Sequence, residues 1–137
     1  MTRITLLDTG PLVAFLSAGD QHHRWAAESF DALTGRLISC EAVVSEASFF
    51  VARGGHRRSV VLELVETMGI EVQPLGAELR TLRQLMDKYA SVPMSFADAC
   101  LVRLSEVHPS SVVMTCDADF RTYRRSNRRV INTLMPP

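Results

Sequence analysis

The sequence predicts an α/β fold in which a central, mostly parallel β-sheet is flanked by helices on both faces. Short apolar runs bounded by turn residues alternate with longer segments whose apolar residues recur at helical spacing. Those helical segments are long enough to act as crossovers between parallel strands. The chain has 137 residues with no low-complexity segment and no linker, which predicts a single domain over residues 1–137.

The first half of the chain is expected to hold two strands and three helices. Residues 4–7 form a short apolar run, and Gly10-Pro11 then opens a helix, because proline is favoured in a first helical turn. The apolar residues between positions 25 and 33 mark one face of a second helix. Residues 37–40 are typical of another strand, and a helix over residues 41–53 follows until two glycines stop it.

The second half is expected to hold three helices and three strands. The expected helices are residues 60–68, 79–89 and 95–108. The expected strands are residues 70–72, 112–115 and, at the end, 130–131. Gly69 ends the first of these helices, and Ser95 begins the last one.

Carboxylates follow two of the expected strands at the point where each strand ends. Asp8 comes directly after residues 4–7, and Asp117 comes almost directly after residues 112–115. Asp119 follows two residues later. Ligands of open parallel sheets bind outside the carboxyl ends of the strands. We therefore expect these three side chains at one edge of the sheet.

Two further acids lie among apolar residues of expected helices. The residues three and four positions from Glu46 are Ala42, Val43, Phe49 and Phe50. Asp98 has Met94, Leu101 and Val102 at the same spacings. An unpaired carboxylate on an apolar face is costly, so both acids need a partner. A bound cation is one such partner.

Each acid also has a structural interpretation that the sequence leaves open. Asp8 could cap the next helix, and Ser95 with Asp98 could form a variant capping box. Asp117 and Asp119 could be turn residues. The acid of the third helix could lie at the helix edge and reach solvent. A shared role is favoured because four separate segments would otherwise need four separate explanations.

Carboxylates without histidine or thiolate ligands suit hard cations such as Mg²⁺ or Mn²⁺. Such an ion lowers the pKa of a bound water and neutralises charge on a phosphate. The acidic residues therefore favour phosphodiester hydrolysis as the chemistry of the site.

Four short segments make the sequence similar to the PIN-domain nucleases, and especially to the VapC-type toxins of bacterial toxin–antitoxin pairs. The matching segments are residues 7–12, 44–46, 96–99 and 115–120. Their order and spacing extend the resemblance over nearly the whole chain.

The resemblance implies a PIN-like fold, Mg²⁺- or Mn²⁺-dependent cleavage of RNA, a homodimer and a cognate antitoxin. It implies that the core acids are Asp8, Glu46, Asp98 and Asp117, with Asp119 as a variable extra acid. It implies that the supporting hydroxyl residues are Thr9, Ser95 and Thr115.

The mechanism that we expect places one or two divalent ions on Asp8, Asp98 and Asp117. Glu46 completes the metal shell or orients the attacking water. Water then attacks phosphorus and leaves a 5′-phosphate and a 3′-hydroxyl. An RNA-binding or RNA-processing PIN module that does not act as a toxin remains the alternative.

Formal net charge is zero, so the charge of the whole chain gives no sign of nucleic-acid binding. Arginines nevertheless crowd the end of the sequence. Arg121, Arg124 and Arg125 closely follow the acids at positions 117 and 119, so we expect them to hold the RNA backbone beside the site. A purely solvated arginine surface is the alternative.

Other acid-containing sites fit the sequence less well. Asp8-Thr9-Gly10 is also the signature of aspartic proteases, but those enzymes are all-β and this chain has mainly helical periodicity. A receiver domain needs a lysine at a strand end, whereas Lys88 lies in a helical segment. Haloacid-dehalogenase-type phosphatases need a second Asp where Gly10 stands. A Ser-His-Asp site stays open, although no G-x-S-x-G motif is present.

Cysteine usage and hydropathy bear on where the protein works. Cys40, Cys100 and Cys116 are odd in number and form no C-x-x-C pair, so we expect reduced apolar fillers. The apolar part of the N-terminus is short for a secretory signal, and no apolar run approaches the roughly 20 residues of a membrane span. We expect a cytoplasmic protein that does not contact membranes.

Overall fold

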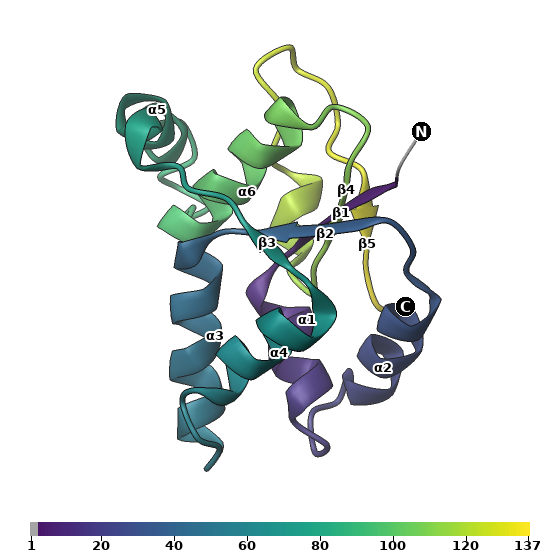
Figure 1. Cartoon of the computed structure of the whole chain (residues 1–137). Coiled ribbons are helices and arrows are strands. Elements are labelled where there is room, and N and C mark those ends of the chain that lie inside the picture. The colour runs from purple at the N-terminus through teal and green to yellow at the C-terminus, as the bar shows by residue number, and fades with distance from the viewer. Residues whose placement is uncertain (1–2) are drawn as a thin grey trace.

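A computed structural model describes residues 3–137 and is shown in Figure 1. The strands are β1 (Ile4–Leu7), β2 (Arg36–Ser39), β3 (Glu71–Val72), β4 (Val112–Met114) and β5 (Thr133–Leu134). The α-helices are α1 (Thr9–Leu16), α2 (His23–Ala32), α3 (Glu41–Arg53), α4 (Val60–Met68), α5 (Leu79–Lys88) and α6 (Phe96–Val107). Two short 3₁₀ turns are η1 (Gly76–Glu78) and η2 (Ala118–Arg121).

The five strands form one sheet in the order β3-β2-β1-β4-β5, and every neighbouring pair is parallel. From β1 the chain builds the sheet outward to β3, then crosses back to place β4 on the other side of β1. The strand order therefore reverses between β1 and β4, and ligands of open α/β sheets bind at such a point. The predicted α/β fold with a parallel sheet is confirmed.

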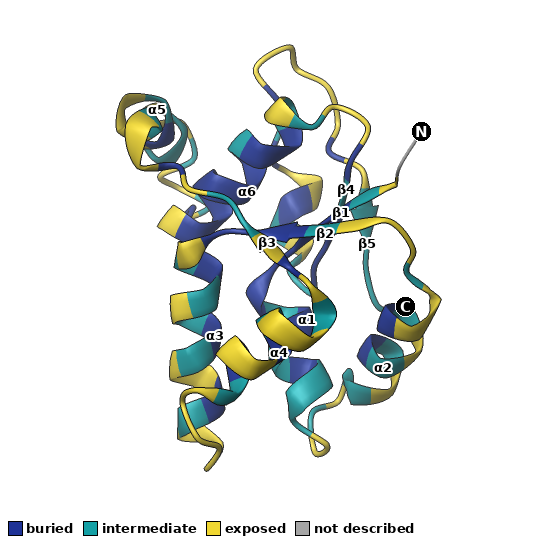
Figure 2. Cartoon of the chain, viewed as in Figure 1, coloured by how far each residue is buried: buried dark blue, intermediate teal, exposed yellow. Residues whose placement is uncertain are grey.

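Helices cover both faces of the sheet. In Figure 1, α5 and α6 lie on one side of the sheet, and α1 to α4 lie on the other. Most of α6 is buried, and its dark ribbon packs directly over the sheet in Figure 2. The central strand is buried too, since Leu6 and Leu7 have no exposed surface. The residue that follows β1, Asp8, and the first turn of α6 are thus held in place by closely packed neighbours.

The last strand lies further along the chain than the sequence predicted. Residues 130–131 are not a strand of the sheet, because Val130 makes only an isolated antiparallel bridge with Arg124 and is 60% exposed. β5 instead pairs Thr133 with Val113. The prediction of a strand at residues 130–131 was wrong. Ile131 is buried in the core without pairing in the sheet, so its apolar character does not indicate a strand.

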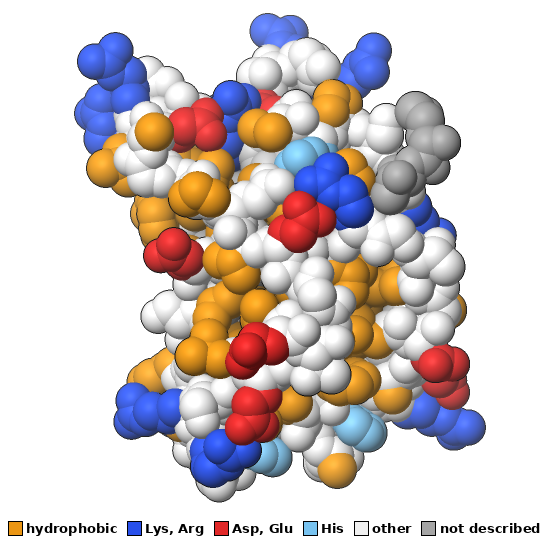
Figure 3. Space-filling view, viewed as in Figure 1, with side chains coloured by type: hydrophobic (Ala, Val, Ile, Leu, Met, Phe, Trp, Pro, Cys, Tyr) orange, Lys and Arg blue, Asp and Glu red, His pale blue; other side chains and the backbone are white. Residues whose placement is uncertain are grey.

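The surface carries charges of both signs. On the face shown in Figure 3, most Lys and Arg side chains lie toward the edges, and they form no continuous basic patch. Several large apolar side chains are exposed: Phe49, Phe50, Leu79 and Phe96. Among the described residues, no helix has the length and apolar character that crossing a membrane requires.

Gly35 fixes the start of the β1–β2 pairing, and its replacement tests the fold. Its φ is +85°, and a Cβ there would lie 2.2 Å from the carbonyl oxygen of Arg3. The next residue, Arg36, donates its backbone N–H to that same oxygen at 2.8 Å. Gly35→Ala should therefore lower the free energy of unfolding by about 2 kcal/mol or more.

Urea-induced unfolding measures this change. Gly19→Ala is the matched control, because a Cβ at Gly19 meets nothing within 4 Å. Equal stability of the two variants would contradict the structural role of Gly35.

Candidate active site

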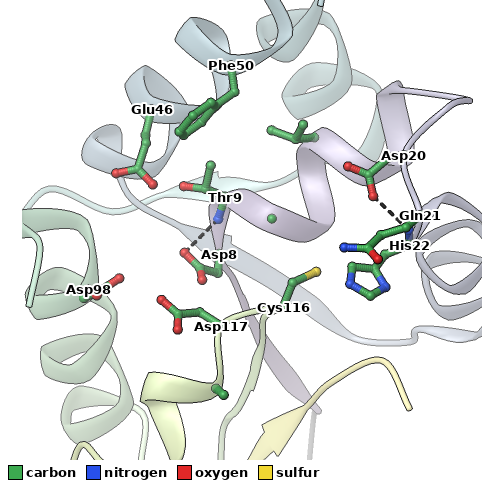
Figure 4. Close-up of a pocket in the computed structure, with 13 residues that line it drawn as sticks. Asp8, Thr9, Asp20, Gln21, His22, Glu46, Phe50, Asp98, Cys116 and Asp117 are labelled. Carbon is green, nitrogen blue, oxygen red and sulfur yellow. Dashed lines mark hydrogen bonds between the residues drawn. The ribbon is translucent and has the colours of Figure 1, made fainter. Parts of the chain in front are cut away.

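A cavity of about 560 Å³ opens where the strand order reverses, between β1 and β4. Its walls come from the β1–α1 junction, the α1–α2 loop, α3, α6 and the segment after β4. The acids that line it are Asp8, Asp20, Glu46, Asp98 and Asp117. Figure 4 shows that Asp8, Glu46, Asp98 and Asp117 lie at one end of this cavity. The four predicted core acids therefore share one cavity.

Asp8 occupies the centre of the acidic end. Its backbone N–H continues the β1–β4 ladder by donating to the Met114 carbonyl at 3.0 Å. Its side chain accepts the Thr9 N–H on Oδ1 at 2.8 Å and the Thr115 hydroxyl on Oδ2 at 2.6 Å. The carboxylate is 6% exposed. Asp8 is thus both the N-cap of α1 and a buried acid facing the cavity.

Burial controls the protonation of Asp8. Desolvation raises the pKa of Asp8 from 3.8 to about 7, because removing water from the carboxylate disfavours its charged form. Hydrogen bonds from Thr115 and Thr9 act in the opposite direction. The negative charges of Asp98 and Glu46 raise the pKa further. None of the salt bridges formed by the described residues includes Asp8.

Asp98 lies in the first turn of α6 and completes its capping box. The Ser95 hydroxyl accepts the Asp98 N–H at 3.0 Å, and Asp98 Oδ2 faces the Ser95 N–H at 3.5 Å. The buried hydroxyl of Tyr123 donates to the same Oδ2 at 2.8 Å. Desolvation raises the pKa of Asp98, and the charge of Asp117 adds to this. No described residue donates to Asp98 Oδ1, so this oxygen can accept a ligand.

Asp117 is positioned through Thr115. The Thr115 hydroxyl donates to Asp8 and accepts the Asp117 N–H at 2.9 Å, so one side chain joins the two acids. Asp117 Oδ1 accepts the Asp119 N–H at 2.9 Å and caps η2. The turn interpretation of Asp117 is therefore confirmed, and it is compatible with the predicted role in the site, because Asp117 also lines the cavity.

Glu46 is carried by α3 on the far wall of the cavity, beside Phe50 (Figure 4). The sequence placed Glu46 on a core-facing stripe, and the structure contradicts this. The buried face of α3 is formed by Val43, Ala47 and Val51. Of the apolar residues beside Glu46, Val43 is buried, whereas Phe49 and Phe50 are 54% and 46% exposed, and Phe50 lines the cavity. An apolar residue can form a ligand wall as well as a core.

The other predicted acid and hydroxyl residues have separate positions. Asp119 is near the site, since the charges of Asp117 and Asp98 add to the desolvation that raises its pKa, but Asp119 does not line the cavity. Thr9 is buried and lines the cavity. Ser95 acts on the site through the Asp98 capping box.

The structure contradicts part of the predicted RNA-binding arginine group. Arg125 is only 7% exposed and donates from Nη1 to the Pro109 carbonyl at 2.9 Å. A buried guanidinium cannot grip an RNA backbone, so this assignment of Arg125 is wrong. Arg124 donates from Nη1 to three carbonyls of its own loop. Arg121 is exposed, and its role in binding the RNA backbone stays a prediction.

Two groups of residues at the site were not predicted from the sequence. Tyr123 contacts Asp98 from twenty-five residues away, and no local pattern marks that contact. Asp20, Gln21 and His22 line the opposite end of the cavity. Their position between the first two helices, on the crossover after β1, was a signal, since that loop lies at the carboxyl edge of the sheet.

The donor groups fit a hard divalent cation. None of the salt bridges within residues 3–137 involves a carboxylate that lines the cavity. No group of three His, Cys, Asp or Glu side chains in those residues could hold a metal ion by itself. Mg²⁺ typically takes one or two protein carboxylates and completes its shell with water and substrate phosphate. Closely spaced acids without a basic partner, and without a closed cage, match that preference.

Fold and site together define an α/β protein with acids gathered where its parallel sheet reverses strand order. The model of the PIN domain family matches residues 5–126, and the chain belongs to that family. Ribonuclease VapC26 of Mycobacterium tuberculosis (strain ATCC 25618 / H37Rv) is 26% identical over 115 residues, covering 82% of this chain and 85% of the relative.

A solved structure shares the fold. It is that of Mycobacterium tuberculosis VapC20, described as a sarcin-ricin loop cleaving toxin. The identity is 21%, and the match covers 86% of this chain and 93% of that chain with a TM-score of 0.78. The predicted PIN-like fold and the resemblance to VapC-type proteins are confirmed.

The raised pKa of Asp8 predicts a pH-dependent loss of stability in metal-free protein. The folded-state pKa lies above the unfolded one, so the folded state holds the proton more tightly. The contribution of protonated Asp8 to the free energy of unfolding is fully present below about pH 4. It is lost as the pH rises through about 7. The loss at higher pH should approach about 4 kcal/mol. Asp8→Asn carries no such penalty and should be more stable than the natural chain at pH 8 in EDTA.

Thermal unfolding at pH 5 and pH 8 measures this difference. Asp31→Asn is the control, because it removes an exposed carboxylate outside the cavity and should change stability little at either pH. A natural chain that is as stable as Asp8→Asn at pH 8 would contradict the assigned burial cost.

Proposed function

We propose that this protein is a Mg²⁺- or Mn²⁺-dependent endoribonuclease and the toxin of a toxin–antitoxin pair. The observation that carries the proposal is the cavity into which Asp8, Glu46, Asp98 and Asp117 point without a basic partner (Figure 4). The relative named Ribonuclease VapC26 and the structural neighbour described as an RNA-cleaving toxin support it. Membership of the PIN domain family supports it independently.

The mechanism assigns a task to each acid. Asp8, Asp98 and Asp117 would hold one or two divalent cations between them, with water and substrate phosphate completing each shell. Asp98 Oδ1 and Asp117 Oδ2 accept no hydrogen bond from the described residues and would be available as ligands. When bound there, such a cation would supply Lewis-acid chemistry to the scissile phosphate and to the attacking water. Glu46, on the opposite wall, orients that water and accepts its proton. The products are a 5′-phosphate and a 3′-hydroxyl.

Neighbouring groups keep the acids in place during this reaction. Thr115 fixes the relative positions of Asp8 and Asp117 through its two hydrogen bonds. Tyr123 and the capping box hold the orientation of the Asp98 carboxylate. Asp119 lies outside the cavity lining and enters the proposal only as an outer group that adds negative charge. Pre-organised acids avoid reorganisation when the substrate arrives.

The proposal includes protein partners and a location. The relatives named as VapC proteins support a cognate antitoxin and a second copy of the chain as partners. The exposed side chains of Phe49, Phe50, Leu79 and Phe96 are apolar surface that such a partner would cover. RNA substrates and free cysteines fit a cytoplasmic location.

Removing either of two metal-binding carboxylates should abolish cleavage. Asp8→Asn and Asp98→Asn are expected to lower the rate of RNA cleavage in Mg²⁺ or Mn²⁺ by about a hundredfold or more, since neither amide replaces the lost charge. Sequencing of RNA ends after expression measures this and identifies the target RNA.

Asp31→Asn is again the matched control and should cleave as the natural chain does. Cleavage by Asp8→Asn at the natural rate would refute the site assignment. A natural chain that binds RNA but never cuts it with either metal would favour an RNA-binding PIN module.

Tyr123→Phe tests positioning of Asp98. Removing the hydroxyl takes a donor from Asp98, and that donor lowers the pKa of the carboxyl. The variant should need about tenfold more Mn²⁺ for half-maximal activity, and the acid side of its pH–rate profile should move to higher pH.

Tyr89→Phe provides the comparison, because its ring packs on Tyr123 at a centroid distance of 5.1 Å but its hydroxyl accepts only the Arg124 N–H. A purely structural role of Tyr123 would lower stability and leave both the metal requirement and the pH profile unchanged.

A further inference from the structure

The cavity that holds the four acids has a second end with different chemistry. In Figure 4, Asp20, Gln21 and His22 lie opposite Asp98 and Glu46, with Cys116 between the two ends. All of these residues line the same cavity. The mechanism of phosphodiester cleavage uses none of the three residues of the α1–α2 loop. They are therefore free for another role in the same site.

Two small residues, Gly10 and Cys116, pack closely against each other and both line the cavity. Gly10 lies on α1 directly against Cys116, where an added Cβ would be 3.0 Å from Cys116 Cβ and 3.1 Å from its Sγ. Cys116 and the carboxylates of Asp8 and Asp20 line this one cavity. A ligand bound at the acids can extend past Cys116 to the α1–α2 loop.

The loop is held in a fixed conformation. Asp20 Oδ1 accepts the His22 N–H at 2.8 Å, and the Asp20 carbonyl accepts the His23 N–H at 3.0 Å. The His23 ring bonds to the Ala14 carbonyl of α1 through Nδ1 at 2.8 Å. Such contacts pre-organise the loop, so a ligand need not order it on binding.

Three polar groups of this loop have no partner among the described residues. They are the second carboxylate oxygen of Asp20, the side-chain amide of Gln21 and the ring nitrogens of His22. The His22 ring stands edge-to-face on Trp25, with ring centroids 6.5 Å apart. One ring face, a fixed acceptor and an adaptable amide are the groups that recognise an unstacked nucleobase in single-stranded RNA.

The charge of the loop selects a base over a phosphate. Asp20 carries a negative charge, and no lysine or arginine lines the cavity. A phosphate here would be repelled, whereas a carboxylate accepts hydrogen bonds from exocyclic amines of bases. Uracil has no such amine. Guanine, cytosine and adenine each have one.

On this basis we infer that Asp20, Gln21 and His22 form a nucleobase subsite that selects an amine-bearing base next to the scissile phosphate. The base stacks on His22 and donates its exocyclic amine to Asp20. The inference rests on the proposed ribonuclease function for its place in the reaction. Gln21 contributes a side-chain amide that can turn to meet either edge of the base.

Cleavage of an RNA oligonucleotide library with randomised positions tests this subsite. The natural chain should prefer an amine-bearing base over uracil at one fixed distance from the cut, by about tenfold. Asp20→Ala should lose that preference, with kcat/KM falling about tenfold on the preferred RNA and little on the uracil-containing one. His22→Ala should lower kcat/KM whichever base stands at that position, because every base can stack on the His22 ring.

Asp31→Asn is the charge-matched control on α2 and should keep the natural cleavage pattern. An Asp20→Ala variant that cuts with an unchanged base distribution at every position overturns the subsite. Equal loss of activity on all RNAs also overturns it, since that result would assign Asp20 a general structural role.

A second measurement keeps the subsite separate from the nuclease proposal. Trp25 is the single tryptophan, so its indole N–H gives one NMR signal beside His22. In EDTA, guanosine, cytidine and adenosine should shift this signal at millimolar concentration, whereas uridine should not. Asp20→Ala should remove the difference. If the natural chain cuts no RNA, the proposed function fails, and this titration alone decides the subsite: a shift without base preference, or no shift, overturns it.

Discussion

Burial of the Asp8 carboxylate where β1 meets β4 is the constraint on which the rest of the structure depends. The carboxylate is 6% exposed and has no basic partner among the described residues. Hydrogen bonds from Thr9 and Thr115 offset only part of the resulting desolvation cost. The fold tolerates this cost because β1 is paired on both sides and packed between two layers of helices. The ionised Asp8 carboxylate therefore lowers the stability of the fold unless a cation is bound beside it.

Helix capping and the proposed metal binding involve the same carboxylates and are not competing interpretations. Asp8 caps α1, Asp117 caps η2, and Asp98 completes the capping box of α6. Each cap fixes the orientation of a carboxylate through backbone N–H groups. Asp98 Oδ1 and Asp117 Oδ2 accept no hydrogen bond from residues 3–137, so capping leaves them available. The start of a helix after a strand thus provides both the position of an acid and its orientation.

The sequence predicted most elements of the fold because their signals are local. Apolar periodicity and end signals such as Gly69 and Ser95 fix helices and strands within a few residues. Convergence of the four acids on one cavity could also be predicted, since parallel strands end at one edge of a sheet. Contacts set by tertiary packing could not be predicted. Burial of Arg125, the Tyr123–Asp98 contact and the half-exposed face around Glu46 depend on where distant segments pack.

Charge balance limits how this chain can distinguish one RNA from another. Formal net charge is zero, Arg125 is buried, and Arg124 is held by loop carbonyls, so few free guanidinium groups lie near the cavity. A phosphate held by a cation attracts every nucleotide equally, because the backbone carries no sequence information. Discrimination must then come from groups that contact bases, and we propose that in this cavity those groups belong to the α1–α2 loop. On that proposal, cleavage and selection lie at opposite ends of one cavity. Substitutions in the loop should then change the preferred RNA while the proposed cleaving carboxylates stay in place.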